Sequence, residues 1–227
     1  MRVLLVCNDK WHEGQVAIDG LMPLVKDNYE IDIITDASDL SSNMLDYYQV
    51  IVLCKSREDV EEDSEYWTNE LQISLVDYVE KGGGLLAIHS SLVGGSNTEI
   101  LDNLLGCRFI SHPEQSIVTT VPLKPHFITQ GIDAFKEKDE HYIIEVIQDD
   151  IDVLFASYSP PQGEESKYET EPYFNAPEIL CTSGYVRKVG KGRICGLTPG
   201  HNTEVWLNPT YQNIIRNALK WCGKKER

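Results

Sequence analysis

Short runs of apolar residues recur in the first part of the chain, and amphipathic or polar stretches separate them. Residues 3–7, 50–54 and 85–88 contain no charged position, and residues 31–34 are apolar except for Asp32. A strand that is buried on both faces of a parallel sheet has this pattern, because neither set of alternating side chains meets water. We therefore expect these four runs to be strands of one mostly parallel sheet.

Helical spacing of apolar residues appears between these runs and at the end of the chain. Residues 67–81 carry such a stripe up to a run of glycines, which is typical of a helix end. Residues 15–26 carry another, which Pro23 interrupts, and Asn208 followed by Pro209 indicates the capped start of a final helix. The alternation of strands and helices predicts an α/β fold with an open, doubly wound sheet and helices on both faces.

The second half of the chain is less regular. Strands are predicted over residues 116–121, 153–156, 180–186 and 193–197. A tight hairpin turn at Gly190 and Gly192 precedes the last of them. Residues 159–177, which are rich in proline and acidic residues, are predicted to be a long loop and a candidate lid. Since no repeat and no convincing linker divides the sequence, we expect one domain over residues 1–227.

The chain is strongly acidic. It has 36 acidic and 20 basic residues, a formal net charge of −16, which repels nucleic acids and anionic membrane surfaces. We interpret the acidic run 58–65 as a solvated helix start rather than a cation site. No uncharged stretch reaches the ~20 apolar residues that span a bilayer. Neither nucleic acid nor a membrane is therefore an expected partner.

Cysteine and glycine patterns narrow the class further. The six cysteines are scattered without a C-x-x-C pair, which favours reduced, buried thiols. The first apolar run is too short for a signal peptide, so we expect a cytoplasmic protein. Residues 82–84 are glycines that precede a strand instead of following one, which is not the arrangement of a Rossmann or P-loop motif. No nucleotide cofactor is therefore expected.

Three of the six histidines, His12, His89 and His201, come just after predicted strands. In doubly wound sheets ligands bind at the carboxyl ends of the strands, and the loops that follow those ends share one edge. We therefore expect these three histidines to share a site. The other three lie in loop-like sequence: His112, His126 and His141. For any one of them a structural role is the more ordinary expectation.

Imidazole side chains can shuttle protons, orient sugar hydroxyls or bind a divalent metal in their neutral form. The sequence has no H-E-x-x-H or other compact metal-ligand spacing, so a metal site would have to be assembled from distant loops. The candidate ligands of such a metal, zinc or manganese, are His12, His89, His112 and His201. The sequence leaves open whether a metal is bound.

Asp139 and Glu140 are adjacent acids in the middle third of the chain. On a strand their side chains would point to opposite sides, so we expect one to act and the other to support it. A carboxylate near His89 would satisfy the geometry of a general base. The structural alternative is that the pair caps or solvates a turn.

A family resemblance emerges around His89. Residues 84–91 stand where class I glutamine amidotransferase-like proteins carry a nucleophile elbow, and His89 occupies the position of its cysteine, which disfavours thiol-based amide hydrolysis. Further matching blocks are residues 9–12, 106–113, 125–131, 139–142 and 190–201. Together these blocks make the chain similar to the ThuA-like (trehalose utilisation) family over nearly its whole length.

The resemblance implies a flavodoxin-like three-layer α/β/α sandwich and a role in carbohydrate metabolism, on trehalose, a related disaccharide or a keto sugar. It makes three residues candidates for catalysis: His89, Glu140 and Asp139. Candidates for substrate binding are His12, His112, His126, Tyr142 and His201. We expect a small-molecule sugar as the partner, and leave a homo-oligomer open. Two function classes remain: a hydrolase, lyase or isomerase acting on sugars, or a non-catalytic sugar-binding or accessory module.

Overall fold

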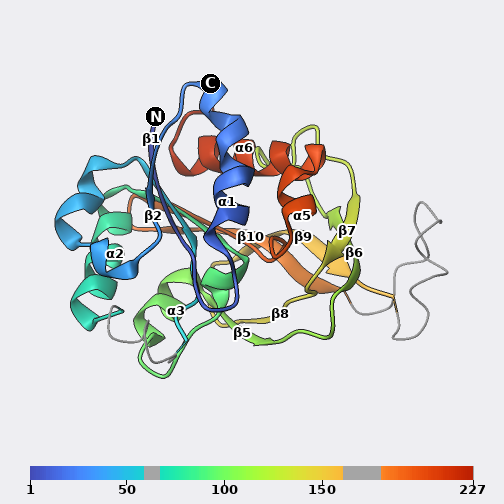
Figure 1. Ribbon diagram of the computed structural model, residues 1–227, viewed down its shortest axis with the longest axis horizontal. Helices are drawn as coiled ribbons and strands as arrows, with labels where there is room; N and C mark the ends of the chain where they lie inside the picture. The colour runs from blue at the N-terminus through green and yellow to red at the C-terminus, as the bar shows by residue number, and fades with distance from the viewer. Residues whose placement is uncertain (59–66, 161–179, 227) are drawn as a thin grey trace.

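The computed structural model describes residues 1–58, 67–160 and 180–226 (Figure 1). Its centre is a nine-stranded sheet in the order β2-β1-β3-β4-β11-β10-β9-β6-β7. The strands of this sheet are β1 (Arg2–Cys7), β2 (Glu30–Ile34), β3 (Val50–Cys54), β4 (Gly84–Ile88), β6 (Ser116–Pro122), β7 (Phe135–Asp139), β9 (Asp152–Tyr158), β10 (Cys181–Val189) and β11 (Gly192–Leu197). A separate antiparallel pair consists of β5 (Cys107–Ser111) and β8 (Ile143–Val146).

Five strands form the parallel half of the sheet, in the order β2-β1-β3-β4-β11. This is the strand order of flavodoxin-like folds, and it confirms the predicted fold class. Every residue of β3 and β4 is buried, and only Arg2 of β1 is exposed. The continuous apolar runs thus mark strands that are covered on both faces.

The other four strands, β10, β9, β6 and β7, extend the sheet through antiparallel pairings, a feature that the sequence did not predict. Each pairing reverses the chain direction, so after four reversals β7 again runs in the direction of β11. The carboxyl end of β7 therefore lies at the same edge of the sheet as those of β1, β4 and β11. Figure 1 shows β6 and β7 at the far end of this extension.

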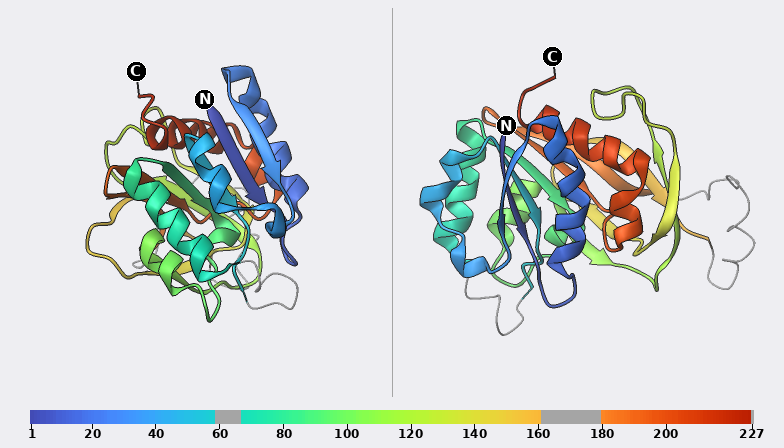
Figure 2. Two further views of the ribbon diagram at one scale, coloured as in Figure 1. Left: turned by 90° about the vertical axis from the view of Figure 1, so that its left-hand side faces the viewer. Right: turned by 45° about the horizontal axis from the view of Figure 1, so that its top comes forward.

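Helices cover both faces of the parallel half, giving three layers (Figure 2). The α-helices are α1 (Gly14–Leu21), α2 (Asn69–Lys81), α3 (Glu99–Leu105), α5 (Thr203–Leu207) and α6 (Pro209–Cys222). Alternate residues of β1 serve the two cores: Leu5 packs with α1 and α6, whereas Leu4 packs with α2 and α3. The 3₁₀ helices are η1 (Met22–Asp27), η2 (Ala37–Asp39), η3 (Ser42–Tyr47) and η4 (His89–Leu92).

Helix ends follow local chemistry, with one departure from the prediction. Gly82 ends α2 with a φ of 126°, and the Asn208 side chain caps α6 by accepting from the amides of Thr210 and Tyr211. The helix predicted over residues 15–26 stops at Leu21 and continues as η1, because Pro23 has no amide hydrogen to donate.

Two predictions concern segments that lie almost wholly outside the described residues. These segments are the candidate lid 159–177 and the acidic run 58–65. None of the helices that the structure describes is long and apolar enough to cross a membrane.

Candidate active site

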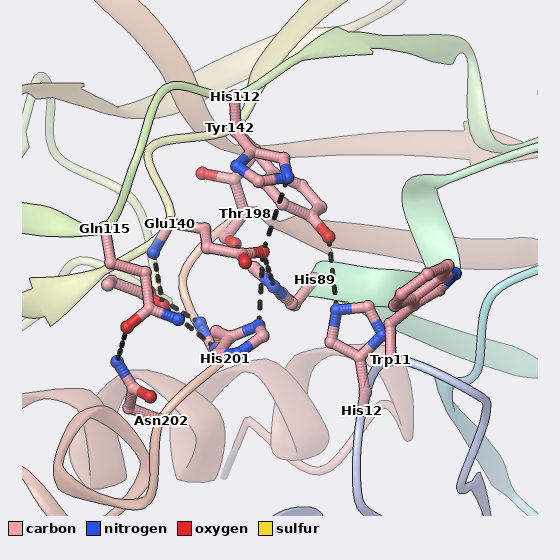
Figure 3. Close-up of polar contacts among 12 residues, drawn as sticks. Trp11, His12, His89, His112, Gln115, Glu140, Tyr142, Thr198, His201 and Asn202 are labelled. Carbon is pink, nitrogen blue, oxygen red and sulfur yellow. Dashed lines mark hydrogen bonds and ion pairs between the residues drawn. The ribbon is translucent and has the colours of Figure 1, made fainter.

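Four side chains from different strand ends meet at one edge of the sheet. His12 follows β1, His89 follows β4, His201 follows β11, and Glu140 follows β7. One ligand atom from each residue lies within 4.8 Å of the other three. We call these four residues the His/Glu cluster. Figure 3 shows the carboxylate of Glu140 turned towards His89 and His201.

The carboxylate of Glu140 holds the centre of the cluster. Its Oε2 atom lies 3.1 Å from His201 Nδ1 and 3.3 Å from His89 Nε2, while His112 Nε2 is 3.9 Å away. Burial opposes ionisation of Glu140, but the two nearer imidazoles outweigh it and keep the pKa of this carboxyl well below its usual value. The same contact with Glu140 raises the pKa of His201. The cluster is therefore built around an ionised glutamate.

Two imidazole nitrogens of the cluster have no hydrogen-bond partner among the residues that the structure describes. His89 Nε2 and His201 Nδ1 are both buried, and their contacts with Glu140 are close but lack hydrogen-bond geometry. Buried polar atoms are nearly always paired, and an exception often marks a missing ion, a missing water or a catalytic group. These two nitrogens thus point to a functional site.

Hydrogen bonds behind the cluster fix which nitrogens face its centre. His89 Nδ1 lies 2.7 Å from the Thr198 carbonyl oxygen, and His12 Nδ1 lies 2.8 Å from Asp9 Oδ1. Both oxygens only accept, so each Nδ1 donates its proton and leaves Nε2 with a lone pair in the neutral ring. His12 Nε2 is also 3.3 Å from the Tyr142 hydroxyl. Orientation of this kind is typical of histidines that bind metals.

Asp9 organises the loop after β1. Its carboxylate accepts from the amides of Trp11, His12 and Ser56 at 2.8 to 3.0 Å, in addition to the His12 ring. Burial opposes ionisation here too, but the His12 ring and these amides keep the pKa of Asp9 below its usual value. The negative charge behind His12 makes its ring a better donor to a cation.

Asp139 supports the site instead of facing its cavity. The side chain is 2% exposed, and its two oxygens accept from the amides of Gly200, His201 and Glu140 at 2.9 to 3.0 Å. Burial raises the pKa of this carboxyl despite these donors. Asp139 therefore ties the loop after β11 to the end of β7. Of the two acids considered for catalysis, the structure gives Asp139 a positioning role and leaves Glu140 in the cluster.

The backbone at His89 is strained. Its φ is 47°, in the left-handed region that residues other than glycine seldom adopt, and η4 begins there directly after β4. The side chain is 2% exposed and stacks on Tyr142, with ring centroids 3.9 Å apart. This sharp turn holds the imidazole at the sheet edge, at the position where the amidotransferase-like comparison places a nucleophile elbow.

Three buried polar residues that the sequence analysis missed follow β3: Lys55, Ser56 and Arg57. Lys55 Nζ donates to the Asn8 carbonyl at 2.5 Å, and the amide of Ser56 donates to Asp9. Arg57 donates twice to the Ser91 carbonyl in the turn after His89. This segment supports both the loop of His12 and the turn of His89. Three polar residues directly after a buried strand are a signal that could have identified it.

A cavity of about 670 Å³ opens above the cluster. Besides His12, Glu140 and His201, its lining includes Trp11, Phe109, His112 and Tyr142. His126, which was a candidate for substrate binding, does not join them. It lines a separate cavity of about 750 Å³, and its ring lies 5.5 Å from that of Trp221. His141 faces the hydroxyls of Ser157 and Ser159, away from the cluster.

The His/Glu cluster has the donors and the size of a divalent metal site. Two atoms that bind one tetrahedral zinc ion at ~2.0–2.2 Å lie ~3.3–3.6 Å apart. The ligand atoms of the cluster, all within 4.8 Å of one another, would therefore have to close in by about 1 Å at the widest pair. Three imidazoles and one carboxylate suit zinc or manganese. The residues that are present fit such an ion.

The fold and the site define a class: an α/β protein with a flavodoxin-like parallel half and a histidine and carboxylate cluster at the carboxyl edge of its sheet. The model of the ThuA family, described as trehalose utilisation, matches residues 2–222. The chain therefore belongs to the ThuA family.

Solved structures with the same fold include a putative ThuA-like protein from Parabacteroides merdae ATCC 43184, 16% identical with a TM-score of 0.72, covering 98% of this chain and 90% of that one. A putative ThuA-like protein from Bacteroides uniformis ATCC 8492 is 18% identical with a TM-score of 0.68, covering 98% and 91%. A cytoplasmic protein from Salmonella typhimurium LT2 is 17% identical with a TM-score of 0.65, covering 99% and 98%. At these identities the likeness shows the fold alone. A comparison with curated proteins found no match.

Proposed function

We propose that this protein is a metal-dependent enzyme of carbohydrate utilisation, which acts on a sugar or keto sugar through the His/Glu cluster. The observation that carries the proposal is the pair of buried, unpartnered imidazole nitrogens of His89 and His201 beside one glutamate oxygen. The family, which is described by trehalose utilisation, supports the class of substrate. The Salmonella typhimurium neighbour, a cytoplasmic protein, supports the same location for this chain.

The argument for a cation starts from the tautomer of His89. Its Nδ1 proton is committed to the Thr198 carbonyl, so in the neutral ring the Nε2 lone pair faces the ionised Glu140 at 3.3 Å. Two electron-rich atoms repel at that distance. Protonation of the ring would relieve the repulsion, and so would a cation between the two atoms. A divalent ion would also take the ligand atoms of His12 and His201, which lie within 4.8 Å of the same carboxylate and of His89, and this is why we favour the metal.

The cation would polarise a carbonyl or hydroxyl oxygen of the sugar when bound. His112 is placed to move a proton beside it. Its Nδ1 lies 2.8 Å from the Pro113 carbonyl oxygen and donates to it, so Nε2 carries the lone pair and lies on the cavity side, 3.9 Å from Glu140. Its side chain is 37% exposed, so its Nε2 atom is within reach of a ligand in the cavity. We assign His112 as the general base or acid and Tyr142 as a hydroxyl ligand of the substrate.

Elemental analysis of the purified, untagged protein tests the metal directly. Zinc or manganese near one equivalent is expected in the wild type, and loss of that metal is expected in Glu140→Gln and in His89→Asn. Asparagine is chosen at residue 89 because it tolerates positive φ. His126→Ala is the matched histidine control and should keep its metal, because His126 lies in another cavity. No metal in the wild type, together with no thermal shift on adding zinc or manganese, contradicts the metal proposal.

Activity separates the enzyme from a non-catalytic sugar-binding module. In an enzyme, His112→Gln should lower turnover of a keto sugar or disaccharide at least ~100-fold while metal content stays unchanged. Measurable sugar binding without turnover of any sugar tested would favour the module. The expectations of no nucleic acid partner and no nucleotide cofactor, and the open question of a homo-oligomer, stay predictions.

A further inference from the structure

Trp11 stands apart from the other tryptophans of the chain. Its residue is 58% exposed, whereas Trp67, Trp206 and Trp221 are at most 5% exposed. Trp11 lies directly before His12 and lines the cavity above the cluster. Figure 3 shows its ring beside His12, on the side of the cluster away from Glu140. A large aromatic ring left open at the mouth of a cavity is the usual form of a contact surface for a ligand.

The backbone of Trp11 is fixed by the site itself. Its amide donates to Asp9 Oδ1 at 2.9 Å, and the same oxygen lies 2.8 Å from the ring of His12. One carboxylate therefore sets the backbone of Trp11 and orients a histidine of the cluster. Because the indole and the cluster line the same cavity, one ligand can contact both.

The rest of the lining combines apolar and polar groups. Phe109 packs against Tyr142 with ring centroids 4.7 Å apart, and both line the cavity. A pyranose ring has the matching surfaces, since its C–H groups form an apolar face and its hydroxyls form a polar edge. The apolar face suits an indole or phenyl ring, and the hydroxyls suit imidazole and carboxylate groups. The volume of about 670 Å³ lies within the range of small-molecule sites.

The charges around this cavity disfavour an anionic sugar. Among the residues that the structure describes, the lining includes the carboxylates of Glu58 and Glu140 and no lysine or arginine. Lys10 Nζ sits over the indole of Trp11, 5.0 Å from the ring centroid, but Lys10 does not line the cavity. The chain as a whole carries a net charge of −16. A phosphate or carboxylate group on the part of the ligand that lies beyond the proposed cation, towards Trp11 and Glu58, would meet no lysine or arginine of the described lining and would be disfavoured.

We propose that Trp11 is the stacking platform of a subsite for an uncharged sugar, a glycoside or disaccharide without phosphate or carboxylate groups. One part of this ligand lies on the indole while another reaches the His/Glu cluster. The inference rests on the proposed function, since it takes the cluster as the reacting end of the cavity. It adds the class of sugar and the residue that selects it.

Fluorescence quenching tests the subsite without relying on turnover. Because the other tryptophans are buried, acrylamide should quench mainly Trp11, and Trp11→Phe should lose most of the quenchable signal. Acrylamide is neutral, so the charge of the protein does not bias the collisions. Trehalose should protect Trp11 from quenching, and glucose 6-phosphate at the same concentration should not. Absence of protection by trehalose, or equal protection by the phosphate ester, overturns the subsite.

Calorimetric titration with trehalose then compares three variants. Trp11→Ala should weaken binding about ten-fold, Trp11→Phe about two- to three-fold, since a smaller ring remains. Tyr47→Ala is the matched control, an aromatic residue that is 64% exposed and does not line this cavity, and should bind as the wild type does. Equal affinity of Trp11→Ala and the wild type contradicts the platform. Metal content is measured on the same samples, so a metal-free protein whose Trp11 is protected by trehalose would refute the proposed function while keeping the subsite.

Discussion

The parallel strands β1, β4 and β11 supply the three imidazoles of the His/Glu cluster, whereas the carboxylate comes from the end of β7 in the antiparallel extension. Behind His12 and His89 lie buried polar residues that follow β3. Behind Glu140 lies Asp139, at the end of β7, which accepts hydrogen bonds from the amides of Gly200 and His201 in the loop after β11. The site therefore lies at the junction of the parallel half and the antiparallel extension. The parallel half holds the three imidazoles, and the extension must lie in the right position to place the carboxylate of Glu140 among them.

Removing the buried side chain of Arg57, which supports the turn of His89 within the parallel half, should give the largest loss of stability. Arg57 is 1% exposed, and its Nη1 lies 3.0 Å from Asp102 Oδ1. Arg57→Met would leave Asp102 without that partner and the Ser91 carbonyl without its donors, which should cost about 3–5 kcal/mol of unfolding free energy. Urea denaturation measures it.

The double variant Arg57→Met/Asp102→Leu checks the cause of that loss. Removing both charges should recover part of the stability, because the buried carboxylate that loses Arg57 keeps only the more distant Arg108, 3.9 Å away. If the single and double variants are equally unstable, the loss comes from packing and not from the charge of Asp102.

Disrupting the contact of Asp139 with the loop after β11, at the junction of the two halves, should give the next largest loss of stability. Asp139→Ala removes the acceptor of three backbone amides at a buried position, which should cost about 3 kcal/mol and lower metal content by displacing Glu140. Asp139→Asn keeps one acceptor oxygen and should lose less. Glu114→Ala, at an exposed acid, is the control for charge removal. Wild-type stability and metal content in Asp139→Ala would show that the junction does not depend on this carboxylate.

The part of the site that lies on the parallel half could be predicted from the sequence, and the placement of the part that lies on the antiparallel extension could not. His12, His89 and His201 stand directly behind buried strands, and strand direction in a doubly wound sheet was enough to bring them together. The strand β7 gave no such signal. Its sequence is Phe-Lys-Glu-Lys-Asp, and only Phe135 and Asp139 are buried. It forms a strand because it pairs with β6, a long-range contact that local periodicity does not encode.

The acids Asp139 and Glu140 were identified as a pair, and alternation predicted that one would support the other. Which of them supports depends on the loop after β11, whose amides bind Asp139. The exposure of Trp11 was likewise outside the reach of the sequence, since nothing in its pattern separates it from the three buried tryptophans.

Metal removal should have an intermediate effect that depends on Glu140. A metal at 100 times its dissociation constant stabilises the folded state by about 2.7 kcal/mol. A chelator should therefore lower the Tm of the wild type by several degrees, while Glu140→Gln, which fills the same space, should show no response. Scanning calorimetry with and without EDTA measures both. A chelator response that survives Glu140→Gln would show that Glu140 is not needed to hold the metal.

The smallest expected effects come from two helix caps in the parallel half, of which only the cap of α6 also contacts the antiparallel extension. Asn208 caps α6, and its Nδ2 also donates to Glu137 on β7 at 2.9 Å, whereas Thr68 caps α2 through Leu71 without reaching the extension. Each cap contributes about 1 kcal/mol, so Asn208→Ala and Thr68→Ala should have similar effects on helix stability. Only Asn208→Ala also loosens β7, and so it alone should increase amide hydrogen exchange in residues 135–139. Equal exchange of β7 in both variants would mean that Asp139, and not the α6 cap, is what holds the extension against the parallel half.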